Sequence, residues 1–167
     1  MTPKFALISD GSCDFSLAEA AQLYVTLAPF YVSFDDKTYR REAYEVGVRD
    51  FYEEMVRNPG VFPKSSMPSV DDYMTLLRPF AQAGTPVLCV CITTKFSGSY
   101  GCATAAAGLI AEEFPGCAIH VMNSRVNTVL QGELVREAVR LRDEGCTLEE
   151  AVERLERVIP TGRIIFT

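Results

Sequence analysis

Four short segments of the chain are dense in hydroxyl-bearing side chains, and three of them follow an apolar run. They are residues 10–14, 64–69, 93–99 and 123–128. In an open α/β sheet, ligands bind beyond the carboxyl ends of the strands, where loops lead into helix N-termini. These four segments are therefore the places where the chain could bind a small molecule or act on one.

The segment Ser97-Gly98-Ser99 carries the strongest chemical signal. At the start of a helix it would present backbone amides and the positive end of the helix dipole to an anion. Gly98 would let a ligand approach the main chain, and a hydroxyl at Ser97 would donate a neutral-to-charged hydrogen bond, a class worth about 1.5–3 kcal/mol. Ser97 could equally be the N-cap of that helix, and the sequence leaves both roles open.

Hydrolysis and nucleotide binding have no motif support. A serine nucleophile needs a base and an orienting group, and the one histidine, His120, lies in an apolar run expected to be a strand. The pattern around Ser97 is not G-x-S-x-G. Neither G-x-x-x-x-G-K-[ST] nor G-x-G-x-x-G occurs in the chain.

Metal and redox sites are also disfavoured. Asp10 and Asp14 are too few carboxylates for a metal cage and are interpreted as turn-forming aspartates. Cys89 and Cys91 share one face of an expected strand without further ligands nearby, so we expect them to pack in the core. The six cysteines form no C-x-x-C pair, which favours reduced thiols and a cytoplasmic location. We expect no metal and no cofactor.

Apolar runs and helical spacings alternate along the chain and define the elements that must position these segments. Strands are expected at 5–9, 27–34, 38–40, 86–92, 117–122 and 162–167, and helices from Ser16 and at 48–56, 69–80, 99–112, 130–143 and 147–158. Residues 58–68 contain too much Pro and Gly for either. This alternation predicts an α/β fold with three layers, in which helices cover both faces of a mainly parallel sheet.

Composition fits one compact domain. The chain has 167 residues, 48% hydrophobic and 23% charged, and a net charge of −6. Its longest basic run is Arg40-Arg41, so nucleic acid is not an expected partner. Apolar stretches are interrupted within about ten residues, well short of the roughly 20 that span a bilayer, so no membrane insertion is expected. The last six residues lack a polar terminator, and we expect the natural protein to continue.

The polar segments, taken in order, resemble motifs of the DegV family. Residues 10–14 match the family's D-S-T-x-D, residues 64–69 its K-T-S-Q-P-S, and residues 97–100 its S-G-T-Y. Asn123-Ser124 and residues 128–132 correspond to a D-S pair followed by an S-x-G cluster, and Tyr39-Arg40 and Phe51-Tyr52 also fit. The resemblance spans nearly the whole chain.

Members of this family hold a long-chain fatty acid between two domains, and several present it to a separate fatty-acid kinase. The resemblance implies that residues 1–167 are the amino-terminal, headgroup-binding domain of such a carrier, which is not an enzyme. Ser65 then takes the place of the headgroup threonine and Ser97 that of the headgroup serine, with amides near Gly98 completing the site. Supporting loop residues are expected to be Asp10, Ser12, Ser66, Thr94, Asn123 and Ser124.

Gly11 replaces the serine of the first motif, and four further departures bear on the assignment of the site. The chain has Ser65 for threonine, Met67 for glutamine, Asn123 for aspartate and Leu130 for a glycine. The carboxy-terminal domain that forms the other wall of the lipid tunnel is absent from the 167 residues. Apolar surface that this wall would cover then faces water, which predicts weak lipid binding or self-association.

Two other functions stay open. The family shares its general shape with part of some dihydroxyacetone kinases, so the hydroxyl-lined cleft could belong to a phosphotransfer or hydrolytic enzyme. An ATP- or metal-dependent shift in melting temperature would favour that alternative. The chain could also be an interaction domain whose hydroxyl-rich loops only cap helices.

Overall fold

The computed structural model describes residues 3–165 and is built on a four-stranded parallel sheet. The strands lie in the order β2-β1-β6-β7, with β1 at Ala6–Asp10, β2 at Val25–Ala28, β6 at Val87–Cys91 and β7 at Ile119–Asn123. Parallel strands end at the same edge of the sheet, so the loops that follow β1, β6 and β7 meet there.

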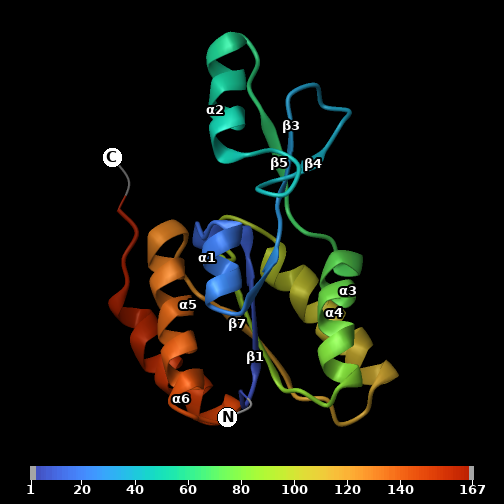
Figure 1. The fold of residues 1–167 in the computed structure, drawn as a ribbon, viewed down its shortest axis with the longest axis vertical. Coiled ribbons are helices and arrows are strands. Elements are labelled where there is room, and N and C mark those ends of the chain that lie inside the picture. Colours follow the sequence, from blue (N-terminus) through green and yellow to red (C-terminus); the bar gives the residue numbers. More distant parts are fainter. Residues whose placement is uncertain (1–2, 166–167) are drawn as a thin grey trace.

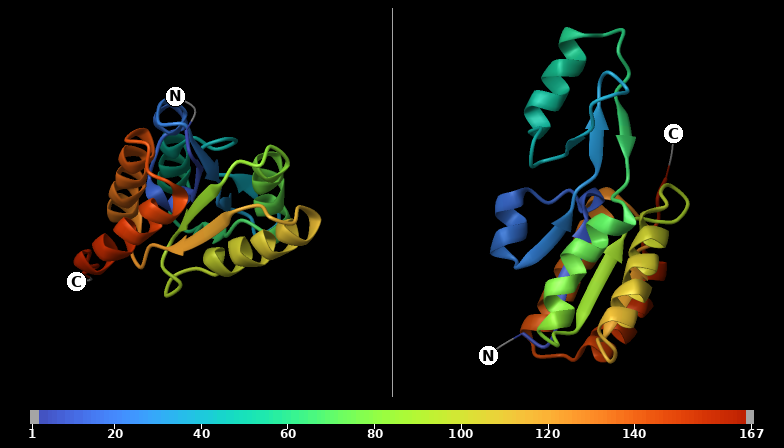
Figure 2. Two further views of the ribbon diagram at one scale, coloured as in Figure 1. Left: turned by 90° about the horizontal axis from the view of Figure 1, so that it is seen from below. Right: turned by 90° about the vertical axis from the view of Figure 1, so that its right-hand side faces the viewer.

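Helices cover both faces of this sheet (Figures 1 and 2). One face carries α1 (Leu17–Gln22), α5 (Thr128–Asp143) and α6 (Leu148–Val158), and the other carries α3 (Val70–Gln82) and α4 (Ser99–Glu113). Successive strand residues point to opposite faces, so Leu88 and Val90 enter one core while Cys89 and Cys91 enter the other. The predicted three-layer α/β/α architecture is confirmed.

Side-chain caps explain where several helices begin. Ser69 and Thr147 form full capping boxes with Asp72 and Glu150, at the starts of α3 and α6. Ser16 caps α1 by accepting a hydrogen bond from the Glu19 amide at 3.1 Å. The spacing of Ser16 and Glu19 is typical of a capping box, but the box is only half formed, because the Glu19 carboxylate pairs with Arg136 on α5 instead.

The prediction of one strand over residues 27–34 is wrong. The run divides at Pro29: β2 ends at Ala28 in the main sheet, and β3 (Tyr31–Ser33) begins a second sheet. Proline has no amide hydrogen to continue a ladder. β3 pairs antiparallel with β4 (Arg40–Arg41) and with β5 (Lys64–Ser66).

Two other predicted segments also differ from the structure. β5 lies inside the segment 58–68 for which neither helix nor strand was predicted, because β3 supplies an edge to which these polar residues pair. Residues 162–165 are not a strand and follow the short 3-10 helix η2 (Ile159–Thr161). Residues 166 and 167 of that predicted strand lie outside the described residues.

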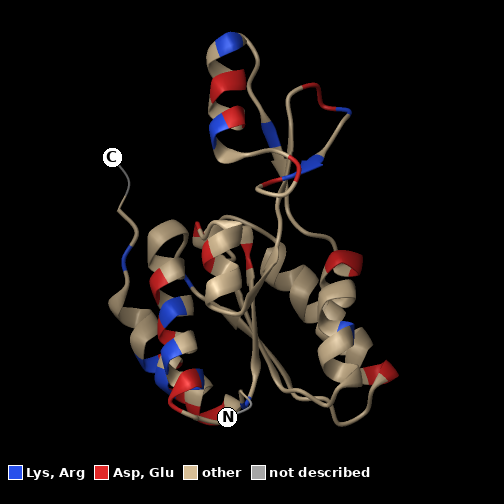
Figure 3. Cartoon of the chain, viewed as in Figure 1, with Lys and Arg blue, Asp and Glu red and all other residues tan. Residues whose placement is uncertain are grey.

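Residues 31–66 form a projecting unit that stands off the carboxyl edge of the main sheet (Figure 1). It consists of the sheet β4-β3-β5 and α2 (Val48–Arg57), which contains no buried residue. Charged residues are spread along α2 and α5 (Figure 3). No helix in the described part of the chain is long and apolar enough to cross a membrane.

Candidate functional site

Three of the four polar segments meet at the carboxyl edge of the main sheet. The segments after β6 and β7 are hydrogen-bonded to each other: Asn123 Nδ2 donates to Thr94 Oγ1 at 3.2 Å, and the Thr93 amide donates to the Val126 carbonyl at 3.0 Å. The fourth segment, 64–69, starts in β5 of the projecting unit and leads into α3. The predicted gathering of hydroxyl-rich loops is therefore present at this edge.

Ser97 lies immediately before α4 and makes two hydrogen bonds. Its oxygen accepts from the Ser99 amide at 3.1 Å, which is a capping interaction, and its hydroxyl donates weakly to the Met67 sulfur at 3.9 Å. The first turn of a helix has amides without intrahelical acceptors. The N-cap residue of α4 is Gly98, so the N-cap role considered for Ser97 is wrong. Ser97 instead satisfies the Ser99 amide from one residue further out, and it also faces the segment that carries Ser65.

Met67 covers Gly98. A Cβ atom at residue 98 would lie 2.9 Å from the Met67 sulfur and 3.1 Å from its terminal methyl carbon. Ser65 and Ser66, the two residues before Met67, are exposed in β5, and Ser65 pairs in register with the buried Val32. The space beside the Gly98 backbone is thus occupied by a side chain from the segment that carries Ser65.

Asp10 lies beneath these loops as a fully buried carboxylate at the end of β1. Its Oδ2 accepts from the Ile92 amide at 2.9 Å and from Ser99 Oγ at 2.7 Å, and its Oδ1 accepts from Gln131 Nε2 at 2.7 Å. These donors are uncharged and belong to the end of β6, α4 and α5. Asp10 is therefore not the turn residue predicted from the sequence; that description fits only Asp14, which is exposed with φ of 59°.

The hydrogen-bond network around Asp10 continues into both cores. Ser99 donates its single hydroxyl proton to Asp10, so the Tyr73 hydroxyl, 2.7 Å away, must donate to Ser99. Burial raises the pKa of Tyr73 far above its usual value, which keeps this donor protonated. Gln131 also donates to Ser9 Oγ at 3.2 Å. Within residues 3–165, no buried side-chain nitrogen or oxygen lacks a partner.

Two of the predicted supporting hydroxyls are turned into the protein. Ser12 Oγ lies 2.5 Å from Gln131 Oε1 and 3.0 Å from Asp10 Oδ1. Ser124 is buried, donates to the Val126 carbonyl at 2.9 Å and accepts from the Val126 amide at 3.3 Å. Both residues shape their own loops. The exposed hydroxyls among the predicted residues are Ser65, Ser66 and Thr94.

The sequence analysis missed the roles of Tyr73 and Gln131, and it placed Ser99 at a helix start without its bond to Asp10; all three residues are fully buried. A signal existed in the apolar stripes of two helices. Tyr73 precedes Leu77 by four residues on α3, and Gln131 precedes Val135 by four on α5, so each polar group occupies a core-facing helical position. Buried polar groups need partners, and such positions indicate a buried network.

His120 does not lie at this edge, and the side chains of Cys89 and Cys91 point into the core. His120 lies near the amino end of β7, beside Leu148 and Glu149 of α6, and burial lowers its pKa. Cys89 and Cys91 have sulfurs 3.8 Å apart inside the core, as predicted. In the described part of the chain, no three His, Cys, Asp or Glu side chains are grouped so as to hold a metal.

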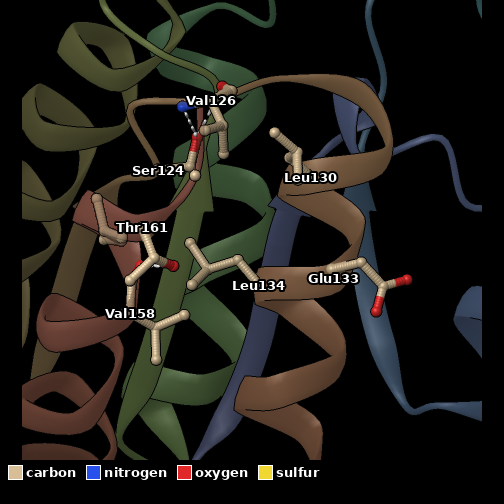
Figure 4. Close-up of a pocket in the computed structure, with 9 residues that line it drawn as sticks. Ser124, Val126, Leu130, Glu133, Leu134, Val158 and Thr161 are labelled. Atoms are coloured by element: carbon tan, nitrogen blue, oxygen red, sulfur yellow. Dashed lines mark hydrogen bonds between the residues drawn. The ribbon is translucent and has the colours of Figure 1, made fainter. Parts of the chain in front are cut away.

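An apolar cavity of about 190 Å³ lies beside the loop after β7 (Figure 4). Leu130 and Leu134 of α5 face it from one side, and Val158 and Thr161 face it from the other. Leu130, which replaces the glycine expected from the resemblance, is thus a wall of this cavity. The Ser124 hydroxyl at its edge is directed into the loop rather than into the cavity.

Comparison with known proteins identifies several relatives. A family model described as "Uncharacterised protein, DegV family COG1307" matches residues 4–167. A DegV domain-containing protein of Clostridium acetobutylicum is 29% identical over 145 residues, which cover 87% of this chain and 50% of the relative.

Solved structures give the same picture. A stearic-acid-binding protein from Eubacterium ventriosum is 39% identical with a TM-score of 0.87, covering 91% of this chain and 52% of the other. A fatty-acid-binding DegV family protein from Thermus thermophilus is 28% identical with a TM-score of 0.80, covering 94% and 54%. The chain thus spans about half the length of these relatives.

Proposed function

The chain belongs to the DegV family, and on that premise we propose that it is the headgroup-binding half of a carrier for long-chain fatty acids. The observation that carries the proposal is the contact of Met67 with Ser97 and Gly98. Through this contact the segment containing Ser65 reaches the start of α4, so both proposed headgroup hydroxyls lie on segments in contact. Fatty acid binding by relatives up to 39% identical supports the same function.

In this proposal the carboxylate is held by hydroxyls and by the helix start together. Ser97 and Ser65 donate hydrogen bonds to its two oxygens, and the backbone near Gly98 adds amide donors at the positive end of the α4 dipole. Asp10 stays out of contact with the ligand, because its carboxylate is already engaged by buried donors. Its role is to hold the loop in place.

The acyl chain supplies most of the binding free energy. Each buried methylene contributes about 0.8 kcal/mol, so the headgroup mainly fixes which end of the ligand enters first. We assign the other wall of the tunnel to a second, carboxy-terminal domain, because the relatives are about twice as long as this chain. Val48, Tyr52 and Val56 form an exposed apolar stripe on α2 that such a domain or a partner could cover.

The proposal is a carrier rather than an enzyme. His120 lies near the amino end of β7, whereas Ser97 follows the carboxyl end of β6, so this histidine is not positioned as a base for that hydroxyl. By family resemblance, a cytoplasmic fatty-acid kinase would receive the bound acid. Such a kinase would transfer a phosphoryl group to the carboxylate of the fatty acid. In this proposal the carboxylate lies at the edge of the sheet that carries the loops.

The first test is mass spectrometry of organic extracts from the natural protein that carries this chain, purified beside the 167-residue chain. We expect a long-chain fatty acid in the first extract. Absence of fatty acid from both extracts, together with an ATP-dependent rise in melting temperature, would instead favour the enzyme alternative.

The second test addresses the site itself. Ser97→Ala in the natural protein should weaken stearate binding by about 10- to 100-fold, the loss expected for one hydrogen bond to a charged group. Thr104→Ala is the matched control, because Thr104 is exposed on the same helix and its hydroxyl donates to the Tyr100 carbonyl one turn earlier. Equal stearate affinity in the two variants would remove Ser97 from the site.

A further inference from the structure

Met67 stands where the two proposed headgroup segments meet. It follows β5 directly, its sulfur lies 3.9 Å from Ser97 Oγ, and it is close enough to Gly98 to collide with any side chain there. The side chain is 39% exposed, so it covers the start of α4 from the solvent side. The position that would take a carboxylate is therefore covered by a thioether in this conformation.

A thioether is a poor substitute for a carboxylate at this position. Sulfur is a weak hydrogen-bond acceptor without charge, whereas the Ser97 hydroxyl and the helix start favour a negative group. A carboxylate would accept the same hydroxyl proton in a charge-assisted bond roughly twice as strong as a neutral one. The interaction between Met67 and Ser97 is thus readily replaced by an anionic ligand.

The local chain lets the Met67 side chain move while its backbone stays in place. Pro68, the next residue, is buried and restricts the backbone of the residue before it. β5 holds the preceding residues by pairing with β3. Methionine itself is unbranched, with three rotatable side-chain bonds, and adapts to irregular apolar surfaces. Displacement therefore needs side-chain rotation alone.

We propose that Met67 is a specificity-determining residue of the headgroup site. It rotates off Ser97 and Gly98 when a fatty acid enters and then packs on the first methylene groups behind the carboxylate. With a long-chain acid, this apolar contact compensates for the displacement of Met67. Acetate or another small hydrophilic anion lacks the acyl chain that makes the contact. The site then selects carboxylates that carry an apolar chain. This inference rests on the proposed function.

The test compares stearate with acetate on the natural protein and its Met67→Ala variant. Stearate affinity is measured by calorimetry and acetate affinity by the amide NMR shifts of Gly98 and Ser99. We expect Met67→Ala to weaken stearate about fivefold and to strengthen acetate about fivefold, each change being the size of one modest contact. The ratio of the two affinities should therefore fall by about 25-fold.

Two further variants separate specificity from stability. Met67→Leu conserves volume and apolar character, so it should keep most of the preference for stearate even though it lacks the sulfur. Met55→Ala removes a comparably exposed methionine from α2 and should leave the ratio unchanged. A ratio that falls equally in the Met55 and Met67 alanine variants would overturn the inference.

The outcomes also distinguish this inference from the proposed function. If stearate binds and Ser97→Ala weakens it, while Met67→Ala leaves the ratio of affinities unchanged, the carrier function stands and the role of Met67 is wrong. If the natural protein binds no stearate at all, the proposed function is overturned and the inference with it.

Discussion

Two groups of hydroxyls lie close together at the carboxyl edge of the sheet, in opposite surroundings. Ser9, Ser99 and Tyr73 are fully buried around Asp10, and every one of them is hydrogen-bonded. Ser65, Ser66 and Thr94 are exposed above them. Ser97 is half-buried between the two groups and bonds the Ser99 amide. The buried hydroxyls, here called the lower group, hold the loops in place. The exposed hydroxyls, here called the upper group, remain available to a ligand.

This difference separates stability from binding. A buried donor or acceptor that loses its partner keeps the full desolvation penalty, about 1–3 kcal/mol and more for charged groups. An exposed hydroxyl that is removed leaves its neighbours in contact with water. Substitutions in the lower group should therefore destabilise the fold, whereas substitutions in the upper group should change ligand affinity alone.

The largest effect is expected for Asp10→Ala. The change leaves the Ile92 amide, Ser99 and Gln131 without their common acceptor. We expect a loss of about 3–5 kcal/mol in the free energy of unfolding, because each buried donor without an acceptor costs about 1–3 kcal/mol. Urea denaturation followed by circular dichroism measures it. Asp14→Asn at the exposed end of the same turn is the control. Similar unfolding midpoints for both variants would contradict the anchoring role.

Gly132→Ala should have the next largest effect. Its Cβ would lie 2.7 Å from the Cys13 carbonyl oxygen, where α5 packs on the turn η1 (Gly11–Cys13), and overpacking of this kind costs about 1–3 kcal/mol. Gly108→Ala in α4 meets nothing within 4 Å and should stabilise the protein by up to about 1 kcal/mol. Thermal melts should shift in opposite directions. The same direction for both would mean that α5 can move away from the turn.

A smaller loss is expected for Tyr73→Phe. The change removes a donor to Ser99, which keeps its bond to Asp10, so the cost should be about 1 kcal/mol. Stearate affinity of the natural protein should stay unchanged, because Tyr73 is buried below the loop. Paired denaturation and calorimetry check both parts. Weaker stearate binding at unchanged stability would mean that Tyr73 contributes to ligand binding rather than to the stability of the fold.

Ser65→Ala should have the smallest effect on stability. The residue is exposed, so its free energy of unfolding should change by less than about 0.5 kcal/mol. The same variant of the natural protein should bind stearate more weakly by about tenfold or more, as expected for a lost hydrogen bond to the carboxylate. A change in the free energy of unfolding without a change in stearate affinity would show that Ser65 stabilises the fold and does not contact the ligand.

The elements with strong local patterns could be predicted from the sequence. The buried strand around Val87–Cys91 and the capped helices after Ser69 and Thr147 were placed within a few residues. The break at Pro29 had a local signal, because proline cannot continue a ladder, but the apolar run across it was interpreted as one strand. The strand β5 could not be placed, because it depends on pairing with β3, which lies far away in sequence. Long-range pairing has no local signature in a short polar run.

The site was predictable only in part, for a related reason. Ser97 and Gly98 were correctly placed at the start of a helix, because a helix start has its own sequence pattern. Asp10 was assigned to a turn because Gly11 and Ser12 follow it, although its partners Ser99 and Gln131 lie about 90 and 120 residues later. A buried carboxylate can be recognised only once the groups that satisfy it have been placed around it.

The projecting unit is attached to the main domain by only two stretches of chain, one on each side of residues 31–66. Its helix α2 buries no residue, and the hydrogen bond from the Tyr31 hydroxyl to Asp72, at 2.8 Å, is one of its ties to α3. Such a unit opens by local unfolding well below the free energy of global unfolding. Amide hydrogens in β3 and β5 will therefore exchange before those of β1 and β6, and a protease will cut this unit first. A ligand that is hydrogen-bonded to both Ser65 and Ser97 would join the projecting unit to the main domain and would therefore slow this exchange and cleavage.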